Sequence, residues 1–376
     1  MRICLVGPAY PYRGGISHYS AMLAREMRAS HDVLLVNFSR LYPDFLFPGR
    51  TQYDEGTPAL GVESKRLIDS INPLSWRRAA DAVCDFNPDI VVFQWWQPFF
   101  APAYRSMCGR IHARTKARIV YVCHNVLPHE SSPVDRALTK LAFSDVDGFV
   151  VQSREDGRIL SALRPGARVE FNPMPVFDLF AAAVDPARSD ALRRELALEG
   201  RVILFFGLVR AYKGLRTLLE AFALEAEPLE ATLLVVGEFY EDREPYDEAI
   251  RQLGIVERVR IVDRYVPDAD VPAYFGVADV VVLPYVSATQ SAIVQTAFSF
   301  ERPVIVTAVG GLPDVVRDGA TGYVVPPQNP RALADAMLRF YRDDAGPRMS
   351  AAIREHAGDF AWSRCVDAII SASSHK

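Results

Sequence analysis

Two cations, Arg210 and Lys213, stand three residues apart shortly after an apolar run at residues 202–206. Gly207 separates the run from the cations, and an amphipathic segment begins after Lys213. A guanidinium and an ammonium at this spacing can hold a diphosphate and neutralise charge that grows on a departing group. The alternative is a solvated basic turn, since both residue types are common on surfaces. Their place between an expected strand and an expected helix favours the phosphate interpretation.

A second cluster of polar, uncharged side chains follows the apolar run at residues 280–284 and enters an expected helix. Hydroxyl and amide groups beside the free N–H groups of a helix start suit a diphosphate and sugar hydroxyls. Ordinary helix capping is the alternative, but one serine would accomplish it. The positions in question are Thr289, Gln290, Ser291, Ala292, Ile293, Gln295 and Thr296. Gly310 and Gly311, after another apolar run, allow a ligand to approach the backbone closely.

Near the start of the chain, residues 8–16 follow an apolar run and precede an expected helix. Gly14 and Gly15 would let backbone N–H groups approach a phosphate, with the helix start adding favourable partial charge. A plain strand-to-helix turn is the alternative. The spacing does not fit the GxGxxG pattern, so a nicotinamide cofactor is not favoured. Tyr12 lies in the same loop.

Four polar residues follow the apolar run at residues 119–122: His124, Asn125, His129 and Glu130. Ligands of open α/β sheets bind beyond the carboxyl ends of the strands, so these side chains are expected to face a ligand. Histidine can donate, accept or titrate near neutrality, which favours a functional role for His124 over simple backbone satisfaction. Trp95 and Trp96 end another expected strand. They would line an acceptor pocket, touch lipid, or form core beneath a long loop.

We expect no metal site. The spacing of His124, His129 and Glu130 misses the helical HExxH pattern, and no third ligand is visible. Asp268 and Asp270 form a DxD triplet, but they begin an amphipathic segment, where helix capping is the simpler interpretation.

The elements that position these residues alternate along the chain. Apolar, β-branched runs suit strands buried on both faces of a parallel sheet, and the segments between them carry apolar residues at helical spacing. The expected strands are residues 3–6, 33–37, 90–93, 119–122, 148–151, 202–206, 231–236, 259–262, 280–284 and 304–307. Helical spacing marks residues 17–29, 185–199, 214–226 and 330–342. This alternation, repeated twice, predicts two doubly wound α/β domains.

Two prolines at residues 173 and 175 mark the expected boundary between the domains. We expect one Rossmann-like domain at residues 1–174 and a second at 175–358. Residues 359–376 are expected to form a helix that returns to the first domain. Residues 41–64 are polar, contain proline and glycine, and are predicted to be a mobile loop.

Composition narrows the class of protein. The chain has 376 residues and a net charge of −4, which argues against a dedicated nucleic-acid binder. No stretch of 18 apolar residues is present, and the short apolar N-terminus suits a strand better than a signal peptide. Five scattered cysteines suggest reduced thiols. We therefore expect a cytoplasmic protein, with peripheral contact to the inner membrane face as an option.

Residues 206–214, 284–297 and 303–316 together resemble glycosyltransferase family 4. The resemblance covers nearly the whole chain and is strongest from Gly207 to Pro326. It implies the GT-B fold, in which two Rossmann-like domains face a deep cleft, a retaining mechanism and no required metal. Gly14 and Gly15 resemble the family's N-terminal glycine loop, and His124 resembles its cleft histidine.

Two features depart from the family. Its members carry two glutamates eight positions apart, one holding sugar hydroxyls and the other the ribose. An alignment on residues 303–307 puts Ala288 and Thr296 at those positions. One or more of Thr289, Gln290, Ser291, Gln295 and Thr296 would have to substitute. Leu208 stands where the family has an arginine, and Arg210 would replace it.

The resemblance implies transfer of a sugar from a nucleoside diphosphate sugar to a hydroxyl of a sugar, lipid-linked or small-molecule acceptor. The predicted catalytic residues are His124, Arg210 and Lys213. Predicted donor contacts are Gly14, Gly15, Gly207, Glu238, Thr289, Gln290, Ser291, Ala292, Ile293, Gln295 and Thr296. Predicted acceptor-side residues are Tyr12, Trp95, Trp96, Asn125, His129 and Glu130. The alternatives are a non-catalytic nucleotide-sugar-binding subunit and a sugar-nucleotide epimerase on the same fold. We expect a monomer or a homodimer.

Overall fold

The computed structural model describes residues 1–43, 51–54, 61–128, 131–178 and 185–374. The chain divides into two compact units. The first unit combines Met1–Pro175 with Ala361–Lys376, and the second unit is Val176–Phe360. The change of unit after Pro175 lies one residue beyond the boundary expected from the two prolines.

The described part of the first unit contains a seven-stranded parallel sheet with the order β3-β2-β1-β4-β5-β6-β7. Its strands are β1 (Arg2–Val6), β2 (Asp32–Arg40), β3 (Lys65–Asp69), β4 (Ile90–Trp95), β5 (Arg118–Cys123), β6 (Gly148–Val151) and β7 (Arg168–Phe171). Its first five helices are α1 (Gly15–Arg28), α2 (Pro73–Phe86), α3 (Ala101–Arg114), α4 (Pro133–Phe143) and α5 (Arg154–Leu163). The order reverses direction between β1 and β4, where open α/β sheets bind ligands.

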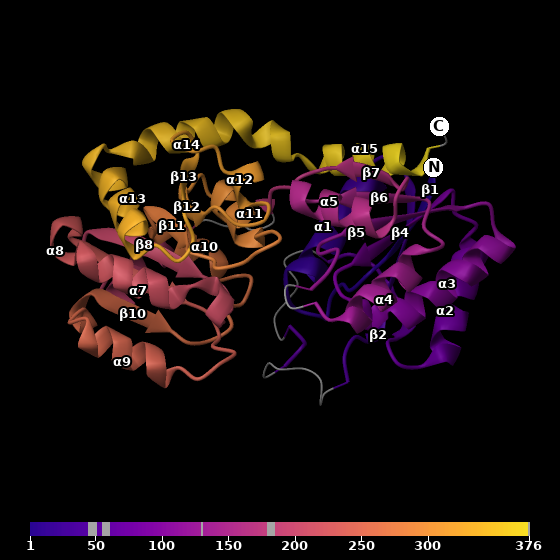
Figure 1. The fold of residues 1–376 in the computed structure, drawn as a ribbon, viewed down its shortest axis with the longest axis horizontal. Coiled ribbons are helices and arrows are strands. Elements are labelled where there is room, and N and C mark those ends of the chain that lie inside the picture. The colour runs from indigo at the N-terminus through magenta and orange to yellow at the C-terminus, as the bar shows by residue number, and fades with distance from the viewer. Residues whose placement is uncertain (44–50, 55–60, 129–130, 179–184, 375–376) are drawn as a thin grey trace. The chain divides into compact units, whose positions relative to one another are not determined.

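The C-terminal helix α15 (Trp362–Ser373) completes the first unit. It packs against α1 and against β5, β6 and β7, as the yellow helix in Figure 1 shows. Gly148 at the start of β6 permits this packing, because a Cβ atom there would lie 2.1 Å from the carbonyl oxygen of Ala372. The tail residues are therefore part of the first unit's core.

The described part of the second unit contains a six-stranded parallel sheet with the order β10-β9-β8-β11-β12-β13. Its strands are β8 (Arg201–Phe206), β9 (Ala231–Val236), β10 (Val259–Val262), β11 (Val280–Leu283), β12 (Val304–Thr307) and β13 (Gly322–Val325). Its helices are α6 (Pro186–Glu195), α7 (Leu215–Leu224), α8 (Ala226–Leu229), α9 (Glu244–Gln252), α10 (Val271–Val277), α11 (Ala292–Ser299), α12 (Leu312–Val315), α13 (Pro330–Arg342) and α14 (Ala345–His356). Here the order reverses between β8 and β11.

The predicted fold class of two doubly wound α/β units is confirmed. Three strands, β3, β7 and β13, were not predicted. Each lies at an edge of its sheet and has only four or five residues, so it lacks the long apolar run of a central strand. Much of the expected loop at residues 41–64 lies outside the described residues.

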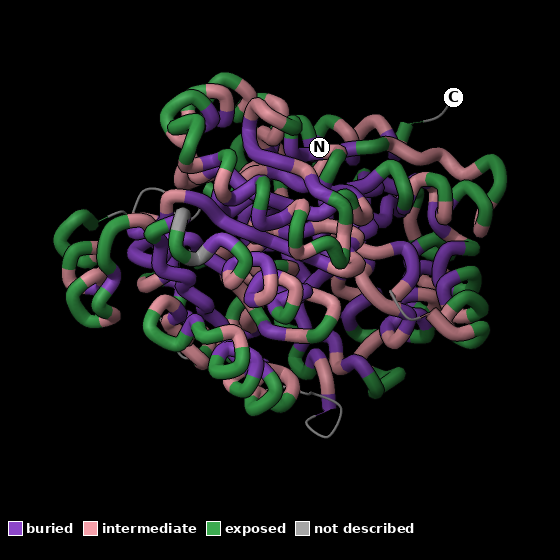
Figure 2. The backbone as a smooth tube through the Cα atoms, turned by 60° about the vertical axis from the view of Figure 1, so that its left-hand side comes forward, coloured by how far each residue is buried: buried purple, intermediate pink, exposed green. Residues whose placement is uncertain are grey.

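Buried residues concentrate in the central strands of both sheets, drawn in purple in Figure 2. Strands β4, β6, β9, β11 and β12 are buried along their whole length. Among the described residues, the first unit contains a hydrophobic core cluster, and the second unit contains clusters on both faces of its sheet. The two sheets therefore provide separate rigid supports for the loops at their carboxyl ends.

Candidate functional site

Three of the sequence motifs meet at the carboxyl edge of the second unit's sheet, where β8 and β11 adjoin. Gly214 has a φ of +72°, and a Cβ atom there would lie 1.9 Å from the carbonyl oxygen of Pro284. The N–H of Val286 donates to the carbonyl of Tyr212 at 2.8 Å. Gly310 has a φ of +51°, and a Cβ atom there would lie 1.7 Å from the carbonyl oxygen of Ala288. Glycine at positions 214 and 310 thus allows the three loops to touch through their backbones.

Lys213 is held between the aromatic rings of this edge. Its Nζ donates to the hydroxyl of Tyr285 at 2.8 Å and lies 4.1 Å from the centre of that ring. The Tyr285 hydroxyl also lies 3.2 Å from Oγ of Ser291, and Oγ1 of Thr307 donates to the Tyr285 carbonyl at 2.6 Å. Burial lowers the pKa of Lys213, but the phenol groups of Tyr285 and Tyr212 outweigh it and hold the pKa above its usual value. The ammonium is therefore charged at neutral pH.

Arg210 adds a second cation beside Lys213. Its guanidinium lies 4.9 Å from the centre of the Tyr240 ring. Its positive charge acts to lower the pKa of Lys213, although the pKa remains raised overall. The nearby carboxylate of Glu241 accepts from the N–H of Ala211 and the hydroxyl of Tyr246. Within the described residues, no carboxylate forms an ion pair with Arg210 or Lys213. The pair therefore presents uncompensated positive charge, which suits an anionic ligand.

The start of helix α11 offers backbone donors next to these cations. Ser291 occupies the N-cap position, but its side chain makes no capping hydrogen bond and turns to Tyr285 instead. The capping interpretation of this serine is therefore wrong. The N–H of Gly311 donates to the carbonyl of Thr289 at 2.9 Å, which ties the glycine pair to the same loop. Ala292 and Ile293, the first residues of the helix, are half-buried, and Ile293 lies against Gly207.

Thr296 and Gln295 of α11 differ in their hydrogen bonding. Oγ1 of Thr296 donates to the carbonyl of Ala292 at 2.9 Å, so this hydroxyl is used inside the helix. Gln295 is 1% exposed, and both its amide atoms lack a hydrogen-bond partner among the described residues. A buried amide without partners is costly, so Gln295 is the stronger candidate for a ligand contact. Glu238 is buried, and its carbonyl accepts from the N–H of Val209 at 3.0 Å.

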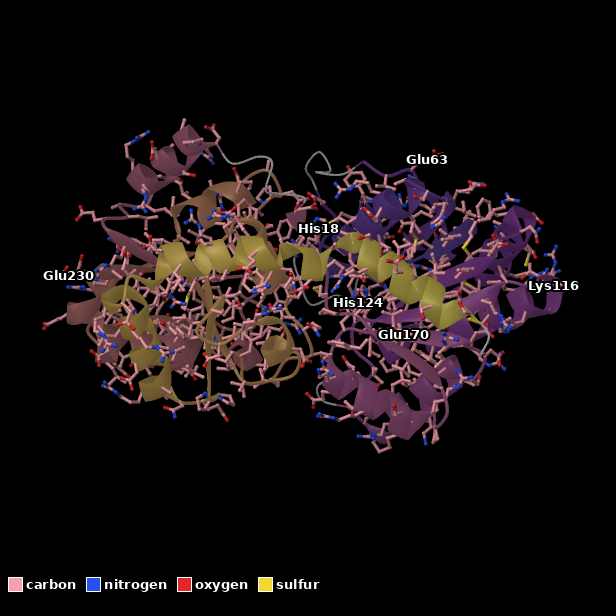
Figure 3. All side chains as sticks on the ribbon, turned by 90° about the horizontal axis from the view of Figure 1, so that it is seen from above. His18, Glu63, Lys116, His124, Glu170 and Glu230 are labelled. Carbon is pink, nitrogen blue, oxygen red and sulfur yellow. The ribbon has the colours of Figure 1, made fainter. Side chains whose placement is uncertain are left out.

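In the first unit, His124 lies just beyond β5 and is 6% exposed (Figure 3). Its Nε2 lies 2.6 Å from Oε1 of Gln94, its ring packs edge-on against Tyr19, and the side chain of Gln152 is close enough to affect its pKa. Burial lowers the pKa of His124 to about 3, with the Gln152 contact opposing this. His124 is therefore neutral at physiological pH and does not titrate near neutrality, contrary to the expectation from residue type.

The first glycine loop is held by a residue that the sequence did not indicate. Oδ1 of Asn37 accepts from the N–H of Ala9, and its Nδ2 donates to the carbonyls of Ala9 and Tyr10. Gly14 has a φ of +105° and precedes α1, where its carbonyl accepts from the N–H groups of Ser17 and His18. Gly15 is the first residue of α1.

The residues predicted on the acceptor side differ in how deeply they are buried. Trp95 is completely buried between Tyr121 and Phe143, and its Nε1 donates to the carbonyl of Val126. Its assignment to an acceptor pocket is therefore wrong, because its whole indole belongs to the core. Tyr12 is also buried, beside Tyr53, whereas Trp96 is half-buried and donates to the Tyr42 hydroxyl at 2.9 Å. Asn125 is half-buried. His129 and Glu130 lie outside the described residues.

Tyr285 and Gln94 are the main site residues that the sequence prediction missed. A tyrosine after a strand reads as core, and only its contacts with Lys213 and Ser291 reveal a second use. Gln94 could have been identified from the sequence, because its amide lies inside the otherwise apolar strand β4. Asp270, of the expected capping pair, precedes α10 without a capping bond and instead pairs with Arg188 at 3.1 Å.

Both halves of the chain match known family models. Residues 14–175 match the glycosyl transferase 4-like domain, and residues 200–343 match the glycosyl transferases group 1. These segments fall in the first and second unit respectively. No helix among the described residues has the length and apolar character needed to cross a bilayer.

Similar proteins include two bacterial enzymes. The D-inositol 3-phosphate glycosyltransferase of Corynebacterium glutamicum is 31% identical over 212 residues, which are 54% of this chain and 48% of that relative. The D-inositol 3-phosphate glycosyltransferase 1 of Catenulispora acidiphila is 30% identical over 264 residues, 65% of this chain and 62% of the relative. The chain spans about half the length of the first of these relatives.

Two solved structures share the fold over almost the whole chain. HepE of Anabaena, solved in complex with UDP, is 18% identical with a TM-score of 0.74 and covers 99% of each chain. Sucrose-phosphate synthase of Thermosynechococcus elongatus is also 18% identical with a TM-score of 0.74, covering 99% of this chain and 97% of the other. Likeness at this level of identity shows the fold alone.

Proposed function

We propose that this chain, which belongs to the GT-B glycosyltransferases of the family 4 type, transfers a sugar from a nucleoside diphosphate sugar to an acceptor hydroxyl. The observation that carries the proposal is the pair of uncompensated cations, Arg210 and Lys213, beside the uncapped start of helix α11. These groups suit a diphosphate that gains charge as its bond to the sugar breaks. The names of the relatives and the UDP complex of HepE support the same class of reaction.

In this mechanism the protein contributes charge and positioning. Arg210 and Lys213 bind the leaving diphosphate, while backbone N–H groups at Ala292 and Ile293 donate to its oxygens. Gln295 supplies an amide where family members use a carboxylate on the same helix. Tyr285 keeps the ammonium of Lys213 in place. The proposal also includes His124 as a catalytic residue, and Gly14 and Gly15 as donor contacts, in the first unit.

We further propose retention at the anomeric carbon and independence from a metal. Two cations at the leaving diphosphate can neutralise charge that other enzymes neutralise with a divalent ion. The class of the acceptor and the cytoplasmic location stay predictions.

The absence of the family's glutamate pair supports one alternative, a subunit that binds a sugar nucleotide without turning it over. Ala288 is buried and packs against Gly310, so no carboxylate occupies that position. Turnover decides between the two functions.

The test compares the unaltered chain with a variant that lacks both cations. First, a thermal-shift screen with UDP, GDP, ADP and dTDP identifies the donor base, since a bound ligand raises apparent stability. Release of nucleoside diphosphate from the matching sugar nucleotides is then measured in EDTA. NMR of the sugar product reports its anomeric configuration. We expect Arg210→Ala with Lys213→Ala to lower kcat/KM at least about a hundredfold, because both groups act on transition-state charge.

The control is Arg216→Ala, an exposed arginine on α7 that pairs with Glu220. It should retain the activity of the unaltered chain. Equal activity in the double variant would refute the role of the cations. Loss of turnover in EDTA would refute metal independence, and an inverted product would refute retention. Nucleotide binding without turnover would favour the non-catalytic alternative.

A further inference from the structure

A groove of about 590 Å³ lies in the first unit, away from the residues to which a role has been assigned above. It runs between helix α5 and the ends of β6 and β7. Its lining combines apolar side chains with two arginines and two serines: Val151, Ser153, Arg154, Gly157, Arg158, Ser161, Val169 and Phe171.

The apolar wall comes from the edge strand β7. Side chains alternate between the two faces of a strand, so Val169 and Phe171 point to the α5 side while Glu170 points to the opposite side. The hydrogen bond from Ser371 of α15 to Glu170, at 2.8 Å, confirms that alternation, and Figure 3 shows Glu170 beside that helix. Phe171 is 38% exposed. An aromatic ring and a valine thus remain accessible at the edge of the sheet.

The opposite wall, helix α5, is cationic and open. Arg154 lies 4.9 Å from the centre of the Phe171 ring, and Arg158 is exposed one turn later. Within the described residues, no carboxylate forms an ion pair with Arg158. Glu155, on the same helix, is exposed and does not line the groove. The charge of Arg158 is therefore available to a ligand in the groove.

Gly157 keeps the groove open. It lies inside α5, where glycine is unfavourable compared with alanine. A Cβ atom there would meet only a methyl group of Val151 at 3.6 Å, so packing alone does not demand glycine. A larger side chain at this position would occupy the groove.

The groove is also connected to the loop that carries His124. The carboxylate of Asp156 in α5 accepts from the N–H of Val126 at 3.1 Å and from Oγ of Ser153 at 2.9 Å. Neighbouring strands lie about 4.8 Å apart, so β7 lies roughly 10 Å from β5. That distance suits a molecule whose reacting hydroxyl lies near His124 and whose remote part extends to β7.

We propose that the groove binds the apolar, phosphate-bearing part of the acceptor. The inference rests on the proposed function and names the acceptor class, an amphipathic phosphate. Val151, Val169 and Phe171 would bury the apolar part, while Arg154 and Arg158 would bind the phosphate, for which guanidinium groups are well shaped. The groove belongs to the first unit, whereas the two cations and the loop before α11 that would bind the donor lie in the second, so the acceptor is the appropriate occupant.

The test measures binding of decyl phosphate, below its micelle concentration, to the full chain by calorimetry. Inorganic phosphate and decyl glucoside are the comparison probes, one for charge alone and one for the alkyl chain alone. We expect one saturable site for decyl phosphate, with affinity at least about tenfold above either comparison probe. Arg158→Glu should weaken binding at least about tenfold, because it replaces attraction by repulsion. Gly157→Leu, which keeps a good helix former in α5, should abolish it.

The matched control is Lys140→Glu, a charge reversal at an exposed position on α4 of the same unit. It should bind decyl phosphate like the unaltered chain. Equal affinity in Arg158→Glu and Lys140→Glu would overturn the proposal. So would binding of inorganic phosphate as tight as that of decyl phosphate. Binding to phosphatidylglycerol vesicles without binding of the monomer would replace it by a membrane contact. Protection by nucleoside diphosphates, measured separately, shows whether the proposed function itself fails.

Discussion

Lys213 illustrates how a single residue of the candidate site is prepared for its role. An ammonium pressed against two aromatic rings would lose hydration, yet the hydroxyl of Tyr285 and the face of its ring replace part of that water. Lys213 donates its hydrogen bond to a neutral phenol and not to a carboxylate, so its positive charge stays available to a ligand. Ser291 then fixes the phenol from the other side.

Removal of the Tyr285 hydroxyl tests this arrangement. We expect Tyr285→Phe to lower kcat/KM by about tenfold to a hundredfold, since a hydrogen bond to a charged group contributes about 1.5–3 kcal/mol. The loss should appear mainly in kcat, because Lys213 acts on charge that grows in the transition state. Steady-state kinetics of nucleoside diphosphate release measures both constants. Tyr274→Phe is the control, because the Tyr274 hydroxyl accepts from Arg264 and belongs to a different set of contacts. Unchanged kinetics in Tyr285→Phe would rule out a positioning role.

At the scale of elements, helix α5 and the loop after β5 are joined by the carboxylate of Asp156. This side chain is buried, and burial raises its pKa from 3.8 to about 6, although the N–H of Val126 and the hydroxyl of Ser153 oppose the shift. Asp156 also takes part in the N-terminal turn of α5, where its backbone N–H donates to Oγ of Ser153. One acidic residue therefore both starts a helix and holds the loop that carries His124.

Asp156 should make the first unit sensitive to pH. Its pKa is higher in the folded chain than in the unfolded chain, so the folded chain binds more protons between about pH 4 and pH 6. The contribution of Asp156 to stability therefore falls as the pH rises through that window and stays low above it. We expect Asp156→Asn to gain up to about 3 kcal/mol relative to the unaltered chain between about pH 4 and pH 7. The amide can still accept from Val126.

Denaturant unfolding of both chains across this pH range measures the difference. Comparing the two chains removes the titration of all other groups. A difference in stability that does not change with pH would contradict the raised pKa of Asp156.

At the scale of the whole molecule, a segment distant in sequence completes the first unit. Helix α15 follows the entire second unit along the chain, yet its Trp362 and Cys365 contact Tyr19 of α1. Its last turn lies directly over Gly148. The two units thus have separate cores, and the first one cannot be completed until the chain has passed through the second.

A side chain at Gly148 should therefore weaken the first unit selectively. We expect Gly148→Val to destabilise it by about 1–3 kcal/mol, because the added atoms would overlap the backbone of α15 at Ala372. Hydrogen exchange followed by mass spectrometry should show lost protection in α15 and β6, with β9 and β11 unchanged. Gly61→Ala is the control, because a Cβ atom there meets nothing within 4 Å. Equal loss of protection in both units would contradict the separation of their cores.

The amino-acid sequence was sufficient to locate the central strands, because a strand buried on both faces must be apolar along its length. The run at residues 231–236 marks β9 residue for residue, and residues 148–151 mark β6. It also determined which loops carry charge and glycine beyond strand ends. Edge strands such as β7 escaped prediction, since only one or two of their residues need to be apolar.

The contacts of the site residues, in contrast, depend on how the chain packs in three dimensions. Burial depends on neighbours that are far away in sequence, so it alone could assign Trp95 to the core and make His124 a neutral histidine. The partner of Lys213 is likewise 72 residues away, at the end of a strand that lies next to its own in the sheet. Residue types and spacing therefore located the chemistry, whereas the packing of parallel strands determined which groups meet.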